Sequence, residues 1–225
     1  MRELTPRVGL AGTLGAAILL LIAALLLIAA APAQAQDPRL ARLPEAARTP
    51  IEALVTAAEA NGLPIEPMID RALEGLAKGA PSPRIVAAVA RLRDELVLVR
   101  GALGERSSPA ELTAGASALR AGATTEALAT LRRLRGQRSL TVPASVLADL
   151  VAGGVPADTA VGSVLALATK AGDADYIAFR RNVQRDIALG ASPAAALGVR
   201  LLGPGGLSDA TVADPNFGGR GKQKP

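Results

Sequence analysis

Glycines recur through the middle of this chain at a nearly constant spacing, which restricts the folds that the chain can adopt. The intervals are 18, 14, 18, 18 and 18 residues between successive members of the set Gly104, Gly122, Gly136, Gly154, Gly172 and Gly190. Each interval fits one helix of about 12–14 residues followed by a short turn. No segment between these glycines alternates at the period of two that a strand requires. The spacing therefore predicts a succession of short helices.

The longest apolar pattern supports an all-α fold. Its members recur at intervals of 4, 3, 4, 3 and 4 residues, as in a helix that packs along its length: Ile85, Val89, Leu92, Leu96, Val99 and Leu103. We predict roughly nine short helices, arranged as glycine-capped helical hairpins. Two arrangements of these hairpins remain open, a compact orthogonal bundle and a short solenoid-like array.

The joints between the predicted helices share one plan, seen in the stretch GVPAD at residues 154–158. Glycine suits the left-handed conformation that ends a helix, and proline followed by an acid suits the first turn of the next one. Anion binding is the competing interpretation, but no G-x-G-x-x-G pattern and no preceding strand accompanies any joint. The residues that we interpret as structural caps are Gly62, Gly79, Ser108, Gly122, Gly154, Pro156, Asp158, Gly172, Gly190 and Ser192.

The first 35 residues have the features of a signal peptide. Arg2 and Arg7 precede an uncharged apolar run over residues 8–31, and the small residues of Ala33-Gln34-Ala35 follow it. The run also reaches the roughly 20 residues that can span a bilayer, so an uncleaved membrane anchor is the alternative. We expect an exported protein, periplasmic or secreted, with a membrane-anchored protein as the alternative.

The remaining chain divides into three predicted segments. Residues 36–48 are expected to form a lead-in linker, because Pro38 and Pro44 interrupt regular structure. Residues 49–202 form the all-α helical-hairpin domain. Residues 203–225 are rich in glycine, proline and charge, which predicts a disordered basic tail.

The composition argues against catalysis. The chain has no cysteine and no histidine, so it lacks the usual thiolate nucleophile, the usual general base near neutral pH and the preferred ligands of transition metals. Its only aromatic residues are Tyr176, Phe179 and Phe217, whereas sugar grooves usually present aromatic platforms. We predict that the protein is not an enzyme and has no cofactor and no metal site.

The most distinctive polar feature is a group of arginines near the Gly136 turn. These side chains could converge on a phosphate or a lipid headgroup, because guanidinium groups bind such oxyanions in a bidentate manner. The alternative is a solvated face with cations placed at the negative end of a helix dipole. The candidate anion or partner contacts are Arg120, Arg132, Arg133, Arg135 and Arg138.

These observations predict a non-catalytic protein-interaction or scaffolding module in the cell envelope, whose partner is another envelope protein of unknown identity. The alternative is a carrier of an apolar or anionic ligand such as a lipid, held in a cavity between helices beside the arginines. Nucleic acid is not expected, because no aromatic residues interleave the arginines. Membrane contact is expected only if residues 8–31 stay uncleaved.

Overall fold

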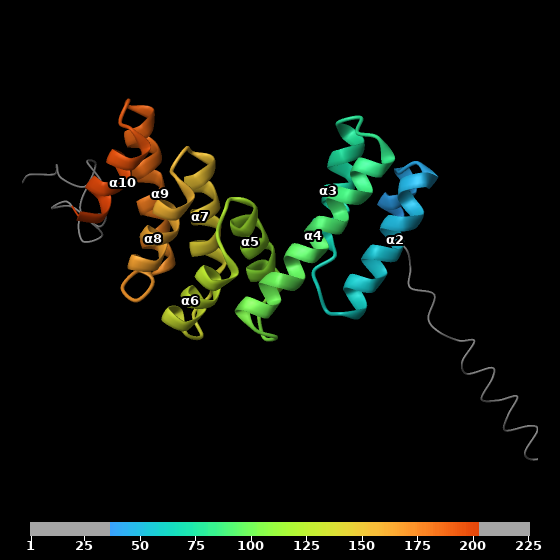
Figure 1. The fold of residues 1–225 in the computed structure, drawn as a ribbon, viewed down its shortest axis with the longest axis horizontal. Coiled ribbons are helices and arrows are strands. Elements are labelled where there is room, and N and C mark those ends of the chain that lie inside the picture. Colours follow the sequence, from blue (N-terminus) through green and yellow to red (C-terminus); the bar gives the residue numbers. More distant parts are fainter. Residues whose placement is uncertain (1–36, 203–225) are drawn as a thin grey trace, which may run out of the picture. The chain divides into compact units, whose positions relative to one another are not determined.

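The computed structural model describes residues 37–202, and this part of the chain is helical, without strands (Figure 1). After a short 3-10 helix, η1 (Pro38–Arg42), it contains nine α-helices. They are α2 (Glu45–Ala60), α3 (Glu66–Ala77), α4 (Ser82–Leu103), α5 (Pro109–Arg120), α6 (Thr125–Arg135), α7 (Thr141–Ala152), α8 (Ala157–Leu167), α9 (Asp173–Ala188) and α10 (Pro193–Leu202). The predicted all-α class is confirmed. The predicted signal peptide or anchor and the predicted basic tail lie outside the described residues.

The N-terminal end of the domain is more regular than its sequence predicts. The segment 36–48, predicted to be an irregular lead-in, contains η1 and the start of α2 instead. Pro44 lies just before α2 with a φ of −55°, where its missing N–H removes no bond of the helix. Leu40 and Leu43 are buried. Apolar packing therefore holds this segment against the domain.

Glycines with positive φ end several of the helices. Gly154, after α7, has a φ of +92°, which L-residues with a side chain rarely adopt. Its N–H donates to Val151 O, and the N–H of Val155 donates to Leu150 O at 3.0 Å. These paired bonds satisfy the last carbonyls of the helix. The same arrangement recurs at four other glycines. Each has a positive φ, and the N–H of the residue after it donates to the carbonyl five residues earlier: Gly62, Gly79, Gly122 and Gly190.

Other predicted caps act at helix N-termini. Ser108 precedes α5 and forms a capping box with Glu111. The Ser192 hydroxyl accepts from the N–H of Ala195 in α10. Pro156 occupies the N-cap position of α8, with Asp158 in the first turn. Gly172 has an extended backbone and precedes α9 rather than ending α8 through a positive φ.

The main helix contacts follow the order of the chain. Each joins elements that are one or two places apart, as for α5 with α7 and α7 with α9 (Figure 1). The long helix α4 contacts α2, α3, α5 and α6, and its predicted heptad face from Ile85 to Leu103 is buried. Where α5 crosses α4, a Cβ on Gly115 would lie 2.5 Å from Val99 Cγ1. This sequential packing is that of a solenoid-like array.

Within residues 37–202, no helix combines the length with the apolar composition that crossing a bilayer requires.

Candidate functional site

Arg135, at the end of α6, is buried, and each nitrogen of its guanidinium donates a hydrogen bond. Only 4% of its surface is exposed. Its guanidinium donates to Ser139 O at 3.1 Å, to Ala171 O at 3.0 Å and to Asp173 Oδ1 at 2.8 Å, and it lies 5.3 Å from the centre of the Tyr176 ring. Since a buried charge is costly unless it is paired and hydrogen-bonded, these contacts make Arg135 a structural tie between α6 and α9.

Arg138, in the turn after α6, donates hydrogen bonds to backbone carbonyls at the C-terminal end of the neighbouring helix α8. It donates to Ala168 O at 2.6 Å and to Ala171 O at 3.3 Å. Ala168 is the C-cap of α8, where backbone carbonyls have no partner within the helix. A guanidinium is suited to this position, because it both donates to these oxygens and opposes the helix dipole.

The other predicted arginines lie apart from this pair. Arg133 is exposed, and within the described residues it donates one hydrogen bond, to Thr130 Oγ1 at 2.8 Å. Arg120 lies on α5, where it donates to Glu95 Oε2 at 2.7 Å and to Ser117 Oγ at 3.2 Å. The structure therefore gathers only Arg132, Arg135 and Arg138 around the α6–α7 turn.

The carboxylate of Glu111 connects three helices at this turn. Its Oε2 accepts from the Ser108 N–H at 2.9 Å, which completes the capping box of α5. Its Oε1 accepts from Arg132 Nη2 of α6 at 2.7 Å and from the Leu140 N–H at the start of α7 at 2.9 Å. Burial acts to raise the pKa of Glu111, but the two backbone donors and Arg132 outweigh it and hold the pKa below its ordinary value.

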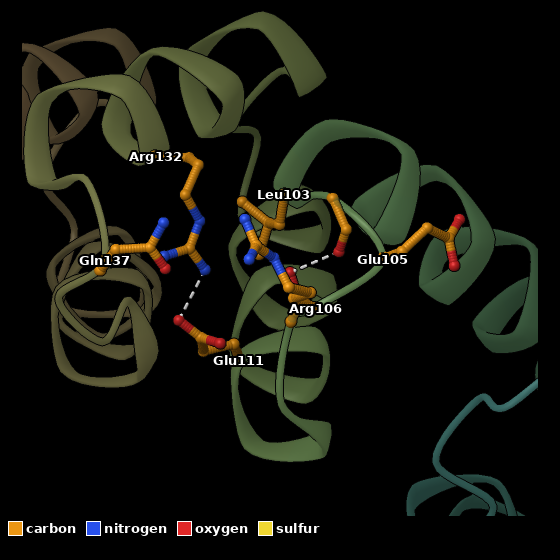
Figure 2. Close-up of a pocket in the computed structure, with 8 residues that line it drawn as sticks. Leu103, Glu105, Arg106, Glu111, Arg132 and Gln137 are labelled. Atoms are coloured by element: carbon orange, nitrogen blue, oxygen red, sulfur yellow. Dashed lines mark hydrogen bonds and ion pairs between the residues drawn. The ribbon is translucent and has the colours of Figure 1, made fainter.

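A surface pocket of about 450 Å³ opens beside the Arg132–Glu111 pair. Leu103, the last residue of α4, and residues 104–107 of the α4–α5 connection line the pocket together with Glu111, Arg132 and Gln137. Figure 2 shows the guanidinium groups of Arg106 and Arg132 approaching the pocket from opposite sides, while the Glu105 carboxylate points away.

The polar groups of this pocket are unequally engaged. Arg132 donates to Glu111 and to the carbonyls of Gly136 and Arg138, so two of its five N–H donors have no acceptor among residues 37–202. Arg106 and the Gln137 side chain have no hydrogen-bond or ion-pair partner in the described part of the chain. The lining contains two arginines and two glutamates, but Glu111 is already paired with Arg132 and the Glu105 carboxylate points away, so Arg106 presents uncommitted donors. The arrangement can bind an oxygen-bearing group that accepts hydrogen bonds.

Arg106 and Gln137 are not among the site residues predicted from the sequence. Glu111 lies three residues after the predicted cap Ser108, which is the spacing of a capping box. The contact of Glu111 with Leu140 spans 29 residues and depends on how α5 packs against α7, for which the sequence has no local signal.

Among residues 37–202, no group of three or more acidic side chains lies close enough together to hold a metal ion. Comparison of the chain with protein-family models, with curated proteins and with solved structures finds no match.

Proposed function

We propose that this protein is an exported, non-catalytic interaction module of the cell envelope, which binds a partner protein at the pocket between the α4–α5 connection and the α6–α7 turn. The observation that carries this proposal is Arg106, a solvent-exposed guanidinium without a partner in the described residues, opposite the anchored Arg132 (Figure 2). Arginine is enriched at protein interfaces, where its planar fork donates several hydrogen bonds and its stem makes apolar contacts.

The anchoring of Arg132 supports recognition at this pocket. Its bonds to Glu111 and to two backbone carbonyls fix the guanidinium before any partner arrives. A donor that is already held in place loses less conformational entropy on binding, so more of its interaction free energy appears as affinity.

Two features of the same pocket favour this proposal over its alternatives. A lipid carrier would need an apolar cavity beside Arg132, and the lining there is mainly polar and charged. A hydrolase would need an acid or base that exchanges protons near neutral pH. Glu111 accepts from three donors and has a lowered pKa, so it is a poor candidate for that role.

Export is proposed from the pattern of residues 1–35.

The test is photo-crosslinking in the native cell envelope, with a photo-reactive residue in place of Gln137. The matched control places the same residue at Gln184, an exposed glutamine of α9 without a hydrogen-bond partner in the described residues. We expect one protein to be captured from position 137, in a yield that Arg106→Gln lowers, and not from position 184. Equal capture from both positions would contradict the proposal, and capture of lipid in place of protein would favour the carrier.

A further inference from the structure

A second pocket brings together arginines from three successive helices. It has a volume of about 350 Å³ and is lined by Arg71 of α3, by Ala88, Arg91, Leu92 and Glu95 of α4, and by Arg120 of α5. We infer that this pocket binds a phosphate group, presented by a lipid headgroup or by a soluble phosphate ester. This site is separate from the proposed partner pocket and does not depend on it.

The helical repeat of α4 builds the base of the pocket. Ala88, Arg91, Leu92 and Glu95 follow one another at intervals of three, one and three residues, which places them on one face of the helix. Leu92 is buried beneath this face, and the small side chain of Ala88 leaves room above it. Since α4 packs against both α3 and α5, the two outer arginines flank this face.

Most hydrogen-bond donors of the three guanidiniums are uncommitted. Arg71 donates to Glu74 at 3.0 Å, and Arg120 donates to Glu95 and to Ser117. Arg91 has no hydrogen-bond or ion-pair partner within the described residues. Each guanidinium has five N–H groups in a planar fork that matches the oxygens of phosphate, so many donors remain for a ligand.

The local charge fits a doubly charged anion. Lys78 and Arg71 both pair with Glu74, at 2.6 and 3.0 Å, and Arg120 pairs with Glu95 at 2.7 Å. With Arg91, this group has four cations and two anions, and a phosphate monoester carries about −1.5 to −2 charge at neutral pH.

The electrostatics at Glu74 agree with this positive excess. The Lys78 ammonium, which donates to Glu74, acts with Arg71 and more weakly with Arg120 to hold the pKa of Glu74 below its ordinary value. The lining of this pocket has three arginines and one glutamate, whereas the lining of the pocket beside Arg132 has two arginines and two glutamates.

The test measures binding of inorganic phosphate to the purified full-length protein by calorimetry, with Arg91→Gln as the main variant. Because Arg91 makes no bond in the described structure, its loss leaves the helix contacts intact, which far-UV circular dichroism will verify. Arg181→Gln, at an exposed arginine of α9 without a partner in the described residues, removes the same charge elsewhere. We expect Arg91→Gln to weaken phosphate binding about tenfold, with no change for Arg181→Gln.

A second arm identifies the source of the phosphate. Vesicles of phosphatidylcholine, with and without phosphatidic acid, are compared, so that insertion of the apolar N-terminal segment cancels in the difference. Binding that increases with phosphatidic acid and falls in Arg91→Gln assigns the site to a lipid headgroup. Binding of inorganic phosphate without this increase assigns it to a soluble ester. Absence of phosphate binding, or equal weakening by Arg91→Gln and Arg181→Gln, would overturn the inference.

Discussion

The carboxylate of Glu111 should stabilise the fold, and Glu111→Gln tests this with little change of shape. The amide keeps one acceptor oxygen, so the capping bond from Ser108 or the bonds from Arg132 and Leu140 must be lost. Loss of the cap costs about 1 kcal/mol. Loss of the negative charge beside Arg132, whose side chain is 22% exposed, costs about 1–2 kcal/mol after allowance for solvent screening. We expect the free energy of unfolding to fall by about 2–3 kcal/mol at neutral pH.

The measurement is urea unfolding followed by far-UV circular dichroism, with Glu105→Gln as the control. The Glu105 side chain is 84% exposed, so its replacement should change the unfolding free energy by less than about 0.5 kcal/mol. The lowered pKa of Glu111 adds a second expectation. Its stabilisation is complete above the ordinary glutamate pKa and is lost as the pH falls through the lowered one, so wild type and Glu111→Gln should converge in acid. The account would be refuted if Glu111→Gln were as stable as wild type at neutral pH. It would also be refuted if the difference between their free energies of unfolding stayed the same in acid.

Two further pairs of variants test the packing. Arg135→Ala should lower the free energy of unfolding by about 3 kcal/mol in urea denaturation, because it removes three hydrogen bonds and the contact of a buried guanidinium with the Tyr176 ring. The exposed Arg133→Ala should change it by less than about 0.5 kcal/mol, and equal effects would contradict the burial described. Gly115→Ala should destabilise by about 1–3 kcal/mol through the clash with Val99. Gly162→Ala, whose added Cβ meets nothing within 4 Å, should raise the melting temperature, since alanine favours a helix by about 0.5–1 kcal/mol; a lower one would show that glycine is needed there.

The features of the fold that could be predicted from sequence are those with local causes. The cap at Gly154 requires a positive φ and two hydrogen bonds within six residues, so its residues are adjacent in the chain. The buried face of α4 is likewise visible as a periodic pattern. Pro44 was misinterpreted as a break because a proline permits either a linker or a helix start. Burial of Leu40 against the rest of the domain decided between them.

The sites depend on contacts that no local pattern encodes. The sequence could not show whether Arg135 faces solvent or the interior, because its partners Ala171 and Asp173 lie 36 and 38 residues away. Arg120 was predicted to lie with the arginines of α6, because they are close to it in the chain. The structure places it beside Arg71 and Arg91 instead. Proximity in sequence is a poor guide to a charge cluster when successive helices contribute one residue each.

The sequential packing of the helices has a consequence for how this chain folds. Because the main contacts in the described region join elements no more than two places apart, no long loop has to close before native contacts form, and the loop-closure entropy stays small. Folding can then start in any hairpin and spread to its neighbours. Opening of α10 at one end of the described region breaks mainly its contacts with α8 and α9. The described domain should therefore unfold in stages from its ends, with hydrogen exchange slowest in the central helices.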